Sequence, residues 1–140
     1  MPKNKAPRKS KKPSQVRKNP SGILNRLTVP EERIQNLKRR AETELLRLYM
    51  RTGSTQDVLS LYTTLQLGKA MLKYISDPER CQEAIHAGEA CLDRYDPESH
   101  AINLDAARDA LNICCDIWRK VSVDEFVTAA RELKCRETPS

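Results

Sequence analysis

Acidic residues are absent from the first 22 positions of this chain, and aromatic residues and glycines are few throughout it. No run of about 18 apolar residues occurs, so we expect no membrane-spanning helix. No apolar segment follows the N-terminal charges, which argues against a secretory signal. The five cysteines are an odd number without a CxxC pair, which favours reduced thiols in the cytoplasm over a disulfide framework.

The acid-free start of the chain is instead rich in basic residues and proline. Its four prolines block helix formation, and Val16 is its one branched aliphatic side chain, so we expect residues 1–22 to be a disordered tail. The chain holds 25 Lys and Arg and 19 Asp and Glu, so 17 cations face 19 anions after residue 22. Eight cations lie within the tail: Lys3, Lys5, Arg8, Lys9, Lys11, Lys12, Arg17 and Lys18.

A tail of this kind predicts a polyanionic partner, and the phosphate backbone of DNA or RNA fits best. The absence of aromatic residues before Gly22 makes stacking on single-stranded bases a poor explanation. No lipidation site or amphipathic anchor accompanies the charges, which argues against a membrane. A tail that only improves solubility, or one that binds an acidic protein surface, remains an alternative.

Behind the tail, apolar residues recur at spacings of three and four, and no segment alternates with a period of two. This predicts an all-α fold, a compact antiparallel bundle of four long helices and a short C-terminal helix. We expect helices over residues 28–51, 55–76, 78–94, 101–120 and 121–134, with the domain spanning residues 23–136 and a frayed end at 137–140. The second helix is apolar on all sides and is expected to be central.

Local motifs predict where these helices begin and end. Thr28 and Glu31 fit a capping box, as do Ser122 and Glu125. Gly53 is placed to end the first helix. Asp77–Pro78 combines a good N-cap with a proline suited to the first turn, so it is expected to start a helix. Asp96–Pro97 repeats this device shortly before the helix expected from about residue 101.

The first helix carries a row of arginines beside its apolar face. Arg33, Arg40 and Arg47 are spaced seven residues apart, so they lie on one side of the helix. We predict that they bind phosphates together with the cations of the tail. Glu44 lies in the same row, which equally fits an ordinary solvated face with weak ion pairs. Leu46 and Met50 lie on the far side of this helix and are a candidate homodimer contact.

No catalytic or metal-binding motif is present. The only soft metal ligands are His86, His100 and the five cysteines, and their spacing does not match a tetrahedral site, so we predict no metal and no cofactor. No nucleophile and base are brought together by a motif, so we predict that the protein is not an enzyme. Acidic residues at the start of the last helix disfavour a recognition helix in the major groove.

Several short segments resemble small, uncharacterised proteins of bacteriophages, plasmids and other mobile elements of Gram-negative bacteria: NKAPRK, RTGST, LDAARDAL, CCDIW and SVDEF. The resemblance implies a helical body and a mobile-element origin, and carries over no functional residue. We therefore expect a nucleic-acid-associated protein whose tail binds the phosphate backbone non-specifically. The alternative is a protein–protein interaction module, such as a phage-encoded inhibitor of a host regulator or defence complex.

Overall fold

The computed structural model describes residues 27–137, with side chains described through residue 135. The expected tail at residues 1–22 therefore lies outside the described residues, as do residues 23–26 and 138–140.

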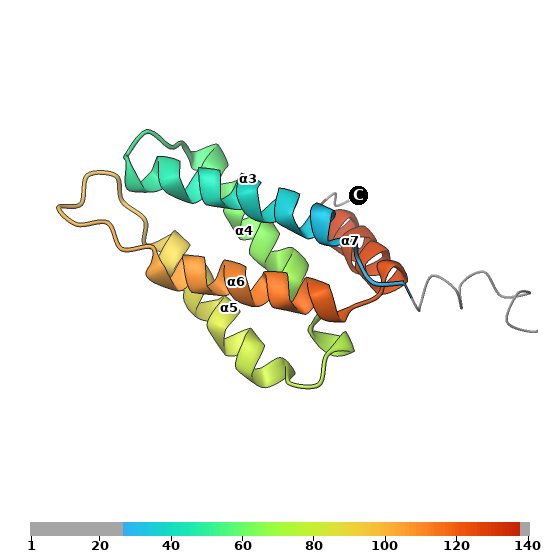
Figure 1. Cartoon of the computed structure of the whole chain (residues 1–140). Coiled ribbons are helices and arrows are strands. Elements are labelled where there is room, and N and C mark those ends of the chain that lie inside the picture. Colours follow the sequence, from blue (N-terminus) through green and yellow to red (C-terminus); the bar gives the residue numbers. More distant parts are fainter. Residues whose placement is uncertain (1–26, 138–140) are drawn as a thin grey trace, which may run out of the picture.

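The fold of the described part is all-α, as the periodicity predicts (Figure 1). Helices α3 to α6 alternate in direction along one bundle, and α7 crosses the end where α3 begins. The last helix is longer than expected, since α7 has 15 residues, the same length as α4. The elements are α3 (Glu31–Tyr49), α4 (Thr55–Lys69), the 3-10 helix η2 (Leu72–Tyr74), α5 (Pro78–Asp93), α6 (Asp105–Lys120) and α7 (Val123–Glu137).

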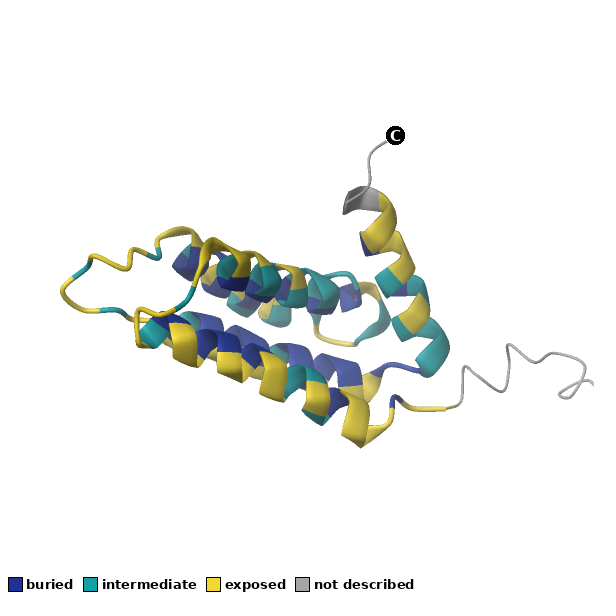
Figure 2. Cartoon of the chain, turned by 90° about the horizontal axis from the view of Figure 1, so that it is seen from above, coloured by how far each residue is buried: buried dark blue, intermediate teal, exposed yellow. Residues whose placement is uncertain are grey.

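The core follows the predicted apolar stripes, which face inward in Figure 2. Its largest fully buried residue is Trp118 of α6, which meets Phe126 of α7 edge to face with ring centroids 6.3 Å apart. Since aromatic pairs favour this edge-on geometry, the contact anchors the start of α7 to the bundle. The predicted stripe of α6 is buried throughout: Leu104, Ala107, Leu111, Cys114, Ile117, Trp118 and Val121.

Helix α4 packs against α3, α5, α6 and α7, as expected of a central helix, although Leu59 remains 55% exposed. It ends at Lys69, earlier than the expected residue 76, and the chain continues through the 3-10 helix η2. Gly68 weakens helix propensity in the last turn of α4. Met71 and Leu72, which follow, are buried and close the core at this end.

The two predicted capping boxes have opposite outcomes. At Ser122 the box forms, because the Ser122 amide donates to Glu125 at 2.9 Å and the Glu125 amide donates to the Ser122 hydroxyl at 3.1 Å. At Thr28 the prediction is wrong, since α3 begins at Glu31 with Pro30 as its N-cap and no side-chain capping bond. Thr28 instead forms an isolated antiparallel bridge with Ser122.

Two further boundaries differ from expectation. Arg51, rather than Gly53, takes the left-handed conformation after α3, with a φ of 63°. Asp96–Pro97 starts a loop and not a helix, because the Asp96 carboxylate accepts a bond from the Glu98 amide at 2.9 Å within a turn. As a result, α6 begins at Asp105 rather than near residue 101.

Candidate binding groove

The eight predicted phosphate-binding residues of the tail lie outside the described residues, but the point where the described chain begins is well defined. The Leu27 carbonyl accepts a hydrogen bond from the Val123 amide at 2.8 Å, and Thr28 bridges Ser122. The chain therefore enters the fold beside the first turn of α7, close to the start of α3 (Figure 1).

A groove lies at this same end, between the start of α3 and the exposed side of α7. Its volume is about 550 Å³. We call it the α3–α7 groove. Its apolar walls come from Val29, Pro30, Val123, Phe126, Val127 and Ala130. Its cationic rim comes from Arg33, Arg131 and Lys134.

Two neighbouring hollows lie beside this groove along the exposed face of α3. One is about 440 Å³ and shares Pro30 and Arg33 with the α3–α7 groove. The other, of about 670 Å³, lies between α3, α4 and α7 and shares Ala130 and Lys134. These two hollows share Leu37 and Arg40 with each other.

The structure places the predicted row of arginines along the groove and these two hollows. Arg33 is exposed on the rim of the α3–α7 groove, and Arg40 lines both neighbouring hollows. Arg47 lines the larger one, where its Nη2 lies 2.6 Å from Asp57 Oδ1. That pairing raises the pKa of Arg47 and lowers the pKa of Asp57, and the hydrogen bond between the two side chains is the largest cause of both shifts. Arg47 is thus engaged within the fold, whereas Arg33 faces the groove.

Glu44 differs from the solvated residue that its place in the row suggested. It is only 5% exposed and accepts a hydrogen bond from the Ser60 hydroxyl at 2.5 Å. Arg40 Nε lies 3.7 Å from its Oε2, and its Oε1 has no hydrogen-bond partner. Burial of this carboxylate follows from packing against α4, which the spacing along α3 alone does not reveal.

Arg131 and Lys134 are the groove cations that the sequence analysis did not single out. They lie three residues apart on α7, so one turn of helix places both on the same side. Their spacing was a usable signal, but it becomes informative only when α7 is seen to lie beside the start of α3.

Leu46 and Met50 are 56% and 63% exposed, in keeping with their expected place on the outer face of α3. Their role as a homodimer contact remains a prediction.

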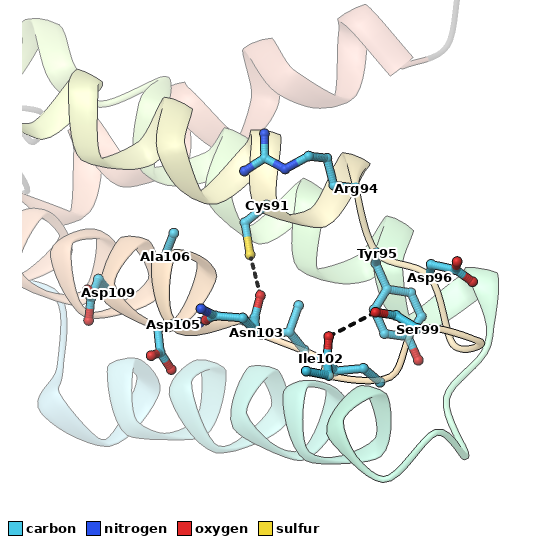
Figure 3. Close-up of a pocket in the computed structure, with 12 residues that line it drawn as sticks. Cys91, Arg94, Tyr95, Asp96, Ser99, Ile102, Asn103, Asp105, Ala106 and Asp109 are labelled. Atoms are coloured by element: carbon cyan, nitrogen blue, oxygen red, sulfur yellow. Dashed lines mark hydrogen bonds between the residues drawn. The ribbon is translucent and has the colours of Figure 1, made fainter.

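A second cavity, of about 500 Å³, lies under the loop between α5 and α6 (Figure 3). Cys91 faces it, and its thiol donates to the Asn103 carbonyl at 3.3 Å. Neither His86 nor His100 is among the described residues that line it. Arg51 fixes the loop from outside by donating to the Pro97 carbonyl at 2.5 Å and to the His100 carbonyl at 3.2 Å.

Across residues 27–137, no three His, Cys, Asp or Glu side chains are grouped so that they could hold a metal ion. None of the helices in this range has the length and apolar character needed to cross a membrane.

Comparison of the chain with protein-family models, with curated proteins and with solved structures finds no match.

Proposed function

We propose that this protein is a small, non-enzymatic nucleic-acid-associated protein of a phage or mobile element, attached to the phosphate backbone by its basic N-terminal segment. The observation that carries the proposal is the place where the described chain begins. The sequence before it holds eight cations within residues 1–22, and its first described residue, Leu27, is hydrogen-bonded at the start of α7. Arg33, Arg131 and Lys134 line the groove at that same end.

The proposed mechanism is electrostatic attachment without base reading. Each cation that contacts a phosphate releases condensed counterions, so affinity falls as salt rises. If most of the eight tail cations engage a duplex, the slope of log K against log salt approaches about −7, from about −0.9 per phosphate. The basic tail contains no aromatic side chain, so it supplies no stacking on bases.

The central test is deletion of residues 2–20 from the full chain. Binding to a labelled DNA duplex and to a matched RNA duplex is measured by fluorescence anisotropy between about 50 and 200 mM salt. We expect the deletion to abolish binding at low salt and to leave the thermal midpoint unchanged, because it keeps every buried residue of the described core. Undiminished duplex binding after the deletion would overturn the proposal.

A matched pair of variants tests whether cations of the groove contact phosphates in addition to those of the tail. Arg33→Gln removes an exposed cation and is expected to make the salt slope less steep by about one unit. Arg47→Gln, assayed well below its unfolding midpoint, is expected to leave the slope unchanged because Asp57 already holds that guanidinium. An unchanged slope in both variants would confine attachment to the tail.

A further inference from the structure

The α3–α7 groove has a feature that phosphate binding does not use, namely its exposed apolar walls. Val127 is 41% exposed, and Phe126, Val123 and Ala130 beside it are only partly buried. Phosphate groups gain nothing from contact with such side chains. Burial of apolar surface is favourable, so the walls point to an occupant with apolar side chains of its own.

The groove is open because α7 diverges from the rest of the bundle. Among the other helices, α7 packs chiefly on α4, and Figure 2 shows it leaving the bundle at an angle. The side of α7 next to the start of α3 is therefore left uncovered by the described residues. A volume of about 550 Å³ lies within the range of pockets that bury a substantial ligand.

The charge of the rim identifies the complementary partner. Arg33, Arg131 and Lys134 line the groove, and no carboxylate does so among the described residues. The guanidinium groups of Arg33 and Arg131 make no hydrogen bond or ion pair with the described residues. Glu132, next to Arg131 in the sequence, pairs with Lys73 at 2.8 Å and does not line the groove.

We propose that the α3–α7 groove docks an acidic amphipathic helix of a partner protein. Its apolar side chains, three or four residues apart, would lie against Phe126, Val127 and Ala130, and its carboxylates would meet the side chains of Arg33 and Arg131. The basic segment before Leu27 has the same sign of charge as the rim and is a poor occupant. This inference shares the cations of the rim with the proposed attachment to nucleic acid, but it also needs the apolar walls of the groove and does not need the tail.

The probe for the test is a labelled helical peptide of about 16 residues with leucines on one face and glutamates on the other. One matched peptide replaces the glutamates with lysines, and another replaces the leucines with serines. Binding to the full chain is measured by fluorescence anisotropy. We expect only the acidic amphipathic peptide to bind, with amide NMR shifts confined to Val123, Phe126, Val127, Ala130 and the rim.

Two variants of the groove have matched controls on α5. Val127→Glu and Arg131→Glu are each expected to weaken peptide binding at least about tenfold. Ala87→Glu and Arg80→Glu make the same kinds of change at exposed positions outside the groove and are expected to leave binding unchanged. Thermal unfolding establishes that each variant is folded, and the two groove variants act through different contacts.

Each alternative occupant predicts a different result. Tighter peptide binding by an Ile23→Ser/Leu24→Ser variant would assign the groove to the chain's own N-terminal segment. A dimer in light scattering that Val127→Glu dissociates would assign it to a second copy. Loss of duplex binding in Val127→Glu, as large as the loss of peptide binding, would assign it to nucleic acid. Equal binding of the acidic and lysine peptides, or no peptide binding, also overturns the proposal.

Deletion of residues 2–20 separates the two proposals, because it is expected to remove duplex binding and to preserve peptide binding.

Discussion

Arg47 and Asp57 join the end of α3 to the start of α4 through a bidentate ion pair. Arg47 Nη2 donates to Asp57 Oδ1 at 2.6 Å, and its Nε lies 3.2 Å from both carboxylate oxygens. Asp57 also accepts a bond from the Ser54 amide at 3.0 Å, which completes a capping box at the start of α4. One carboxylate thus fixes both a helix start and the turn between two helices.

Replacement of Asp57 therefore tests whether this junction stabilises the fold. We expect Asp57→Ala to lower the thermal midpoint by about 5 °C, because it removes both the cap and the partner of Arg47. Asp57→Asn retains an acceptor for the Ser54 amide and is expected to have a smaller effect. Glu83→Ala, an exposed acidic residue of α5, is the control and should leave the midpoint unchanged. A midpoint for Asp57→Ala equal to that of the control would contradict the assignment.

Local sequence motifs predicted this fold well where their partners are also local. The Ser122–Glu125 capping box forms as expected because both of its residues are free to bond each other. The same pattern fails at Thr28 because Glu31 is instead bound by Arg119, 88 residues away, at 3.0 Å. A distant partner with two or three hydrogen bonds outweighs one local cap.

The candidate groove was predictable only in part, for the same reason. The spacing of Arg33, Arg40 and Arg47 correctly places them on one side of α3. The burial of Glu44 and the capture of Arg47 depend on Ser60 and Asp57, which α4 supplies. The apolar wall of the groove depends on the angle at which α7 leaves the bundle, which no local pattern specifies.

Close packing of α5 on α6 gives a second prediction, at Gly88. A Cβ there would overlap the Cβ of Ala110 and lie 3.1 Å from the Ala106 carbonyl oxygen. We expect Gly88→Ala to destabilise the fold by about 1–3 kcal/mol in urea unfolding, despite the better helix propensity of alanine. The double variant with Ala110→Gly removes the overlap and should be more stable than the two single effects predict when summed. Strict additivity would show that the helices separate to accommodate the methyl group.

The five thiols give a third prediction, because their burial differs sharply. Cys135 is exposed and Cys81 is partly buried, whereas Cys114 and Cys115 are buried. Burial raises the pKa of Cys114 and of Cys115, which further suppresses the reactive thiolate. We expect N-ethylmaleimide to modify Cys135 first and Cys81 more slowly. Cys114 and Cys115 should react only as fast as the fold opens, as measured by peptide mass spectrometry. Labelling of Cys114 at the rate of Cys135 would refute the packing of α6.

The final prediction concerns the pH dependence of the contact between Glu31 and Arg119. Arg119 donates to both Glu31 oxygens, and Gln35 donates to Oε2 at 2.8 Å. The hydrogen bond from Arg119 has the largest effect, and together with the bond from Gln35 it lowers the pKa of Glu31 from 4.5 to about 2. A carboxyl group with a lowered folded-state pKa stabilises the fold above its ordinary pKa, and this contribution is lost as the pH falls through the folded-state value.

Glu31→Gln should therefore lower the thermal midpoint most at pH values above about 4.5, and the difference from wild type should shrink as the pH falls toward about 2. Glu42→Gln on the exposed face of the same helix changes the same net charge and is the control. The change in thermal midpoint caused by Glu42→Gln is subtracted from that caused by Glu31→Gln at each pH. This removes the general effect of losing one carboxylate, so the remaining difference reports the contact with Arg119. A remainder that is constant from pH 7 to pH 2, or that grows as the pH falls, would show that this ion pair does not hold α3 to α6 in solution.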